Sequence, residues 1–109
     1  MSDPAHPVVQ MVYWVDTTIL PPGDRETQRP VVVIATPGRV SGTVAVVARS
    51  GTDPFGPEHP PDERLGLGSP GRFSRRHPVL GHLWSAGTVR LAGRLDDATF
   101  AAVVARFRL

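Results

Sequence analysis

Arginine side chains supply most of the chemistry that this sequence offers. All twelve basic residues are arginine, and a guanidinium is a planar fork that binds phosphate or carboxylate oxygens in pairs. Arg29 stands directly before Pro30, and a proline holds the preceding residue in an extended conformation. We expect Arg29 to bind a phosphate. The alternative is an ion pair with Asp24 or Glu26 in the preceding loop, and surface pairs of that kind contribute little stability.

A second arginine cluster lies at Arg75 and Arg76, directly before His77. Phe73 precedes it, and arginines beside an aromatic ring are a common way of holding single-stranded RNA. Phe73, Arg75 and Arg76 are therefore candidate RNA-binding residues, with an ordinary solvated loop as the alternative. His77 is of a type that transfers protons near neutral pH. A lone histidine in a loop is more often inert, so we assign it no catalytic role.

Metal and cofactor sites are not expected. His59 and His82 are far apart in the sequence, and we expect no carboxylate to join them at ligand spacing. A zinc site needs three or four converging ligands. The chain has no cysteine, which excludes disulfides and thiolate ligands.

The bulk composition limits the protein to one small domain. The chain has 109 residues, of which 12 are proline and 11 are glycine, and this content favours short strands and loops over long helices. Its net charge of +2 does not demand a nonspecific polyanion ligand. Residues 1–8 read as a flexible lead-in and 9–109 as a single domain. Because the N-terminus shows no signal pattern and no apolar run reaches membrane-spanning length, we expect a cytoplasmic protein with no membrane partner.

Short strands with turn residues between them are expected to position these arginines. The predicted strands lie at 8–16, 31–35, 42–51 and 87–93. The long segment 52–87 is expected to be a covering or functional loop, with short turns of strand or helix around 72–74 and 79–84. This order favours an antiparallel sheet or a small β-barrel over βαβ units.

The chain is expected to end in a helix that packs on the sheet. Asp96 is a suitable N-cap, and Asp97 favours the positive end of the helix dipole. Leu95 can pack on the helix as a hydrophobic staple. A single apolar stripe follows at helical spacing: Phe100, Val103, Val104 and Phe107. The predicted fold is thus a mainly β barrel with a C-terminal helix.

Several segments together resemble the PemK/MazF-type toxin family. They are "YWVD" in the first strand, the Arg–Pro pair before a Val/Ile strand, "VAVVARSG", and the segment "GPEHPPDERLGLGSPGRFS". The similarity covers residues 10–107. It implies an SH3-like barrel that dimerises. It also implies a toxin of a type II toxin–antitoxin system: a metal-independent endoribonuclease, hence a hydrolase, that cleaves single-stranded RNA and is inhibited by an antitoxin. DNA would be contacted only indirectly, through that antitoxin.

The resemblance also assigns roles to individual residues. In this family the 2′-hydroxyl of RNA attacks the adjacent phosphate, so cations must stabilise the developing charge. Arg29 matches the family's arginine before proline and is the expected catalytic phosphate clamp. Arg49 stands where the family usually has a catalytic threonine, so Ser50 is the candidate hydroxyl and Arg49 a second substrate-binding arginine. Asp16 is expected either to orient Arg29 across the sheet or to be a solvated strand end.

The departure at Arg49 leaves alternatives open. A protein of the same fold that has lost catalysis would act as a protein-interaction or RNA-binding module. A small β-protein of another barrel family is the third possibility, because a fold does not fix a function.

Overall fold

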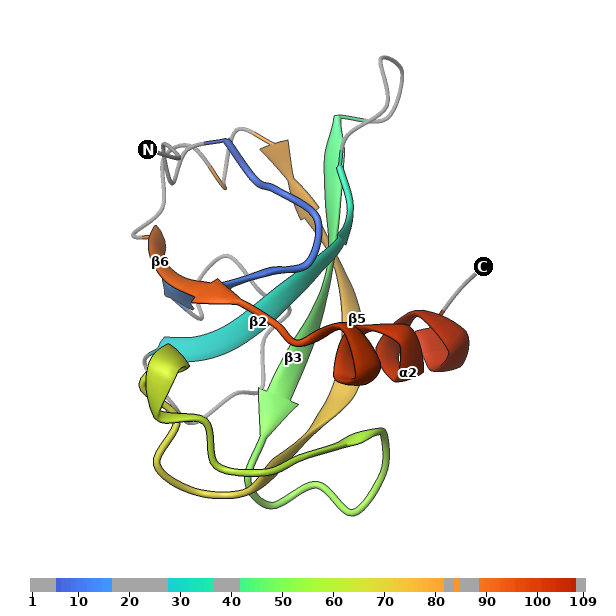
Figure 1. The fold of residues 1–109 in the computed structure, drawn as a ribbon. Coiled ribbons are helices and arrows are strands. Elements are labelled where there is room, and N and C mark those ends of the chain that lie inside the picture. Colours follow the sequence, from blue (N-terminus) through green and yellow to red (C-terminus); the bar gives the residue numbers. More distant parts are fainter. Residues whose placement is uncertain (1–5, 17–27, 37–41, 82–83, 85–88, 108–109) are drawn as a thin grey trace.

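A single antiparallel sheet of six strands forms the body of the molecule. The computed structural model describes residues 6–16, 28–36, 42–81, 84 and 89–107. The strands follow the spatial order β4-β5-β3-β2-β1-β6, and the sheet curls into a half-barrel (Figure 1). Their bounds are Met11–Asp16 (β1), Gln28–Ala35 (β2), Thr43–Ser50 (β3), Glu58–His59 (β4), Gly71–Leu80 (β5) and Val89–Arg94 (β6).

Both faces of the sheet are buried in the central strands. Alternating β-branched residues send successive side chains to opposite faces, where they pack well on a pleated surface. On one face, which we call the Trp84 face, the buried cluster consists of Tyr13, Val15, Val31, Val33, Val44, Val46, Ala48, Val79 and Trp84. On the other, the helix face, it consists of Val12, Val32, Val47, Leu65, Leu67, Phe73, Leu95 and Val103.

The C-terminal helix α2 (Asp97–Phe107) lies against the helix face (Figure 1). Its predicted N-cap is confirmed, because Asp96 Oδ2 accepts the backbone N–H of Thr99 at 2.9 Å. Val103 is completely buried, and Phe100 and Phe107 pack against the same cluster. Phe100 thereby joins Leu95 in one cluster, as the staple predicts. The mainly β fold with a C-terminal helix is therefore confirmed.

The prediction for residues 52–87 was wrong in its main point. The four predicted strands correspond to β1, β2, β3 and β6, but Gly71–Leu80 forms a further strand, β5, of 10 residues. β5 pairs with β3 from Arg72 to Leu80, whereas β4 covers only the first two residues of β5. Among the residues that the structure describes, most of β5 thus has no strand on its other side, and charged residues and a proline are tolerated on such an edge. A short 3-10 helix, η2 (Glu63–Leu65), follows β4.

Gln10 fastens the first strand to the start of the C-terminal helix. Its backbone N–H donates to the carbonyl of Val33, and its own carbonyl accepts the N–H of Leu95. Its side-chain Nε2 donates to the carbonyl of Leu95 at 2.8 Å and to Asp97 Oδ1 at 2.7 Å. In the described part of the chain, no helix is long and apolar enough to cross a membrane.

Candidate functional site

Arg29 and Ser50 lie at the same end of neighbouring strands. β2 pairs with β3 through Val31 opposite Ala48, and this register, continued by two residues, brings Arg29 opposite Ser50. Directly opposed residues project to the same face, here the Trp84 face. The guanidinium of Arg29 also donates from Nη1 to the carbonyl of Arg49 at 3.2 Å. A cation and a hydroxyl are therefore carried by neighbouring strands at the same end of the sheet.

Ser50 organises the turn that follows β3. Its Oγ accepts the backbone N–H groups of Thr52 and Asp53, each at 3.2 Å. The Oγ of Thr52 lies 3.4 Å away and can exchange a hydrogen bond with it. A serine hydroxyl has one proton to donate and two lone pairs to accept with. Ser50 therefore keeps its proton available for Thr52 or for a phosphate oxygen.

A β-bulge in β5 brings a further arginine to this face. Ala48 pairs with Arg75, but Arg49 pairs with Phe73 and Ser50 with Arg72, so Ser74 is the extra residue. As a result Arg72 and Arg75 both project to the Trp84 face, on the same side as Ser50. Sequence reasoning missed Arg72, because the bulge that turns it to this face leaves no clear sequence signal.

Both arginines are tied to the loop between β3 and β4. Arg72 donates from Nη1 to the carbonyl of Gly56 at 2.9 Å, and its Nη2 lies 2.6 Å from Glu58 Oε1. Arg75 Nε lies 3.7 Å from Asp53 Oδ2, with its side chain 74% exposed. Pairs as exposed as this last one are weak. The guanidinium of Arg75 therefore remains accessible to another anion.

Arg49 lies on the opposite face from Arg29 and Ser50, and it is only 5% exposed. Its Nε donates to His59 Nδ1 at 2.9 Å, and its Nη2 donates to the carbonyls of His59 and Ser69 at 3.2 and 2.7 Å. Gly71 makes room for it, since a Cβ there would lie 2.8 Å from Nη1. The expected role of Arg49 as a second phosphate-binding arginine does not fit this position, because its guanidinium already donates to acceptors inside the protein.

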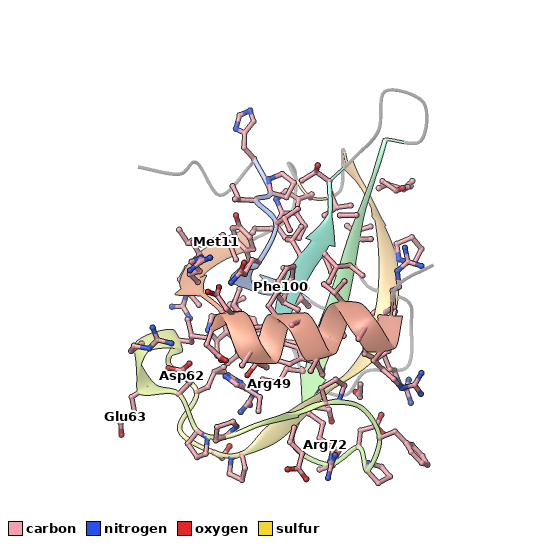
Figure 2. The ribbon with its side chains drawn as sticks, turned by 45° about the vertical axis from the view of Figure 1, so that its right-hand side comes forward. Met11, Arg49, Asp62, Glu63, Arg72 and Phe100 are labelled. Atoms are coloured by element: carbon pink, nitrogen blue, oxygen red, sulfur yellow. The ribbon has the colours of Figure 1, made fainter. Side chains whose placement is uncertain are left out.

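His59, Asp62 and Asp96 form a polar cluster beside Arg49. Figure 2 shows Arg49 and Asp62 near the beginning of α2. His59 Nε2 lies 3.5 Å from Asp62 Oδ2. Burial, and next the positive charge of Arg49, lowers the pKa of the His59 imidazole below its usual value. Burial likewise lowers the pKa of the Arg49 guanidinium.

The donor set of this cluster does not fit a metal ion. One potential ligand atom each from His59, Asp62 and Asp96 lies within 4.8 Å of the others. However, His59 Nδ1 accepts a hydrogen bond from the Nε–H of Arg49, so a neutral ring must carry its own proton on Nε2. A metal on Nε2 would move that proton to Nδ1, where it would face the Arg49 donor. The i,i+3 spacing of His59 and Asp62 is the sequence signal that could have revealed this cluster.

The remaining predicted residues project to the opposite face of the sheet from Arg29 and Ser50. Phe73 is completely buried, so its ring is not available for stacking on a base. Arg76 pairs with Val47 and projects to the helix face, where its Nε is buried without a hydrogen-bond partner. Asp16 lies opposite Gln28, one position beyond the Val15–Arg29 pair, and so projects to the other face from Arg29. Asp24, Glu26 and His82 lie outside the described residues.

Arg29, Ser50, Arg72 and Arg75 thus make up the candidate site, and they share one end and one face of the sheet. A set of guanidinium groups around a hydroxyl can bind a phosphate and stabilise negative charge that develops on it. Comparison with protein-family models, with curated proteins and with solved structures finds no match to this chain.

Proposed function

We propose that this protein binds single-stranded RNA at the Arg29–Ser50 end of the sheet and cleaves it without a metal ion. The observation that carries the proposal is the Arg29 guanidinium held on the carbonyl of Arg49, beside the hydroxyl of Ser50. Arg72 and Arg75 on the same face would hold flanking phosphates. The proposal also includes the SH3-like barrel fold of PemK/MazF-type toxins. The protein would form a homodimer in the cytoplasm and would be bound by an antitoxin.

The proposed reaction forms a bond between the RNA 2′ oxygen and phosphorus and breaks the bond from phosphorus to the 5′ oxygen. The 2′-hydroxyl loses its proton, the leaving oxygen gains one, and the products are a 2′,3′-cyclic phosphate and a 5′-hydroxyl. Arg29 would bind the non-bridging oxygens as negative charge grows on them. Ser50 would donate a hydrogen bond from its hydroxyl to one of the same oxygens.

The test is incubation of the protein with a mixed single-stranded RNA in the presence of EDTA. Fragments that end in a 2′,3′-cyclic phosphate are expected from the wild type. Arg29→Ala should reduce cleavage on the order of 10²-fold, the usual cost of losing one charge-stabilising donor. The control is Arg64→Ala, which removes a guanidinium whose side chain is 69% exposed in η2. Cleavage unaffected by Arg29→Ala would contradict the proposed site.

One observation favours a second function, binding of RNA without cleavage. At the position where the resemblance expects a catalytic threonine, Arg49 is buried and hydrogen-bonded to internal groups. The nearest hydroxyl, that of Ser50, already accepts two backbone N–H groups. A protein that binds RNA with Arg29-dependent affinity but releases no fragments would support this function and exclude the nuclease.

A further inference from the structure

Phe55 is the most exposed large hydrophobic residue in the described part of the chain. Phe55 is 69% exposed, whereas Leu80 is 47% exposed and Val8 and Val9 are about 40% exposed. Single exposed apolar residues are common and need no explanation by themselves. Phe55 differs from the others because it is aromatic and because the loop that carries it is fixed.

The loop is attached to the body of the protein on both sides of Phe55. Before it, the backbone N–H of Phe55 donates to Asp53 Oδ1 at 3.2 Å, and the N–H of Asp53 donates to Ser50 Oγ. After it, the carbonyl of Gly56 accepts a hydrogen bond from Arg72, at 2.9 Å. The N–H of Phe73 also donates to the carbonyl of Pro57. Phe55 is thus presented to solvent on a preorganised support.

Gly56 shows how closely this support is packed. A Cβ at Gly56 would lie 2.1 Å from the carbonyl oxygen of Phe73, and its φ of +99° favours glycine. The backbone next to Phe55 is therefore pressed directly on β5. A backbone that is fixed before the ligand arrives lowers the entropy cost of binding.

The position of Phe55 connects it with the candidate site. The hydroxyl of Ser50 accepts the backbone N–H of Asp53, and the carboxylate of Asp53 accepts the backbone N–H of Phe55. Two successive hydrogen bonds therefore link the backbone of Phe55 to the proposed phosphate-binding hydroxyl. Arg72 and Arg75 bind the same loop, at Gly56 and Asp53. An exposed ring on a loop that also contacts arginines able to hold phosphates is a combination suited to single-stranded nucleic acid, because bases stack on the ring while cations hold the backbone.

From this arrangement we propose that Phe55 is the stacking platform for a nucleobase next to the phosphate bound at Arg29 and Ser50. The inference rests on the proposed RNA function and adds the residue that holds a base. Stacking on an aromatic face tolerates every base, so Phe55 contributes affinity with little sequence preference.

The experiment measures binding of a fluorescein-labelled 12-nucleotide oligouridylate by anisotropy. It compares Phe55→Ala, Phe55→Leu and Phe55→Trp with the wild type. The Ala and Leu variants should bind roughly 5- to 150-fold more weakly, the range found for one stacked base. The Trp variant should retain affinity, and its added emission should be quenched by the RNA. The control is Leu80→Ala, at the opposite end of β5 and 47% exposed in the wild type.

A second ligand separates stacking from charge. An abasic ribose-phosphate oligomer of equal length should bind the wild type and Phe55→Ala equally, because it has no base to stack. If Phe55→Leu binds oligouridylate as tightly as the wild type while Arg29→Ala loses binding, the stacking role is overturned and the RNA function stands. If the wild type binds neither oligomer, both proposals fall.

Discussion

Arg49 donates its Nε–H to Nδ1 of His59 over 2.9 Å in the interior of the protein. Both side chains are buried, with His59 2% and Arg49 5% exposed. The bond therefore provides a hydrogen-bond partner for two polar groups that water does not reach. The bond also fixes the histidine tautomer, because Nδ1 must keep its lone pair to accept. It connects the end of β3 to β4 on the helix face.

Loss of Arg49 should therefore destabilise the fold. Arg49→Met removes the donor to His59 and to the carbonyl of Ser69 and leaves those buried acceptors unsatisfied. We expect a loss of about 2–4 kcal/mol, since each buried acceptor left alone costs about 1–3 kcal/mol. Urea denaturation measures it. Arg64→Met, which alters an exposed arginine, should stay within about 0.5 kcal/mol of the wild type. Equal stability of the two variants would contradict the structural role of Arg49.

The same pair predicts a pH dependence of stability. Because the pKa of His59 is lowered in the folded protein, the unfolded chain binds a proton first as the pH falls below the ordinary value of 6.5. The contribution of His59 to the free energy of unfolding should thus be constant above about pH 6.5 and decrease below that pH. The decrease continues until the pH passes the folded pKa, with a slope of at most about 1.4 kcal/mol per pH unit.

Urea midpoints between about pH 7.5 and 5 measure this slope. His59→Gln keeps an acceptor for Arg49 and has no proton to gain, so its midpoint should vary less with pH over the same range. A wild type that becomes more stable on acidification would show that His59 is protonated in the fold.

The strands that bury alternate residues could be predicted from the sequence, and β5 could not. β1, β2 and β3 are rich in β-branched and aromatic residues, which favour strands. In β5 only Phe73 and Val79 are buried, and the strand contains Pro78, which lacks a backbone N–H. Such a sequence is typical of a loop. It is a strand because β3 supplies its hydrogen bonds and because its other side is mostly an edge.

The candidate site was predictable only in part for a related reason. The Arg–Pro pattern and the strand end at Ser50 are local features, and they are visible in the sequence. The burial of Arg49 depends on His59 and Ser69, which reach it from distant segments. The face of Arg72 depends on the bulge at Ser74, because the extra residue changes the alternation of side chains between the two parts of β5. Neither arrangement follows from residue type or spacing.

Gln10 should respond in an unusual way to substitution. Its φ of +74° is strained for a residue with a Cβ, and its side chain donates to Leu95 and Asp97. Gln10→Ala should lose both hydrogen bonds and keep the strain, at a cost of about 1–2 kcal/mol. Gln10→Gly should lose the same bonds but relieve the strain, and so be more stable than Gln10→Ala by about 1 kcal/mol. Thermal denaturation ranks the two, and the reverse order would contradict the strained backbone.

Arg75 should contribute one phosphate contact to RNA binding. Its side chain is 74% exposed and pairs only loosely with Asp53. Arg75→Ala should weaken binding of every single-stranded RNA similarly and reduce the slope of log affinity against log salt by about 0.7. The slope is obtained from titrations over a range of salt concentrations. Arg64→Ala should leave it unchanged, and an unchanged slope for Arg75→Ala would place the RNA elsewhere.

Gly56 should connect the stability of the loop with RNA binding. Gly56→Ala places a methyl group against the carbonyl oxygen of Phe73, which is backbone and cannot rotate away. The loop must then lift from β5, and the hydrogen bonds to Arg72 and Pro57 weaken. We expect a loss of about 1–3 kcal/mol in thermal or urea denaturation. RNA affinity should also fall, because Phe55 loses its support.

The matched control is Gly68→Ala, because a Cβ at Gly68 meets nothing within 4 Å. It should leave stability within about 0.5 kcal/mol and RNA affinity unchanged. If Gly56→Ala behaves like Gly68→Ala in both measurements, the loop is not pinned to β5, and the preorganised support for Phe55 does not exist. If Gly56→Ala is destabilised but binds RNA normally, the loop is pinned and the base lies elsewhere.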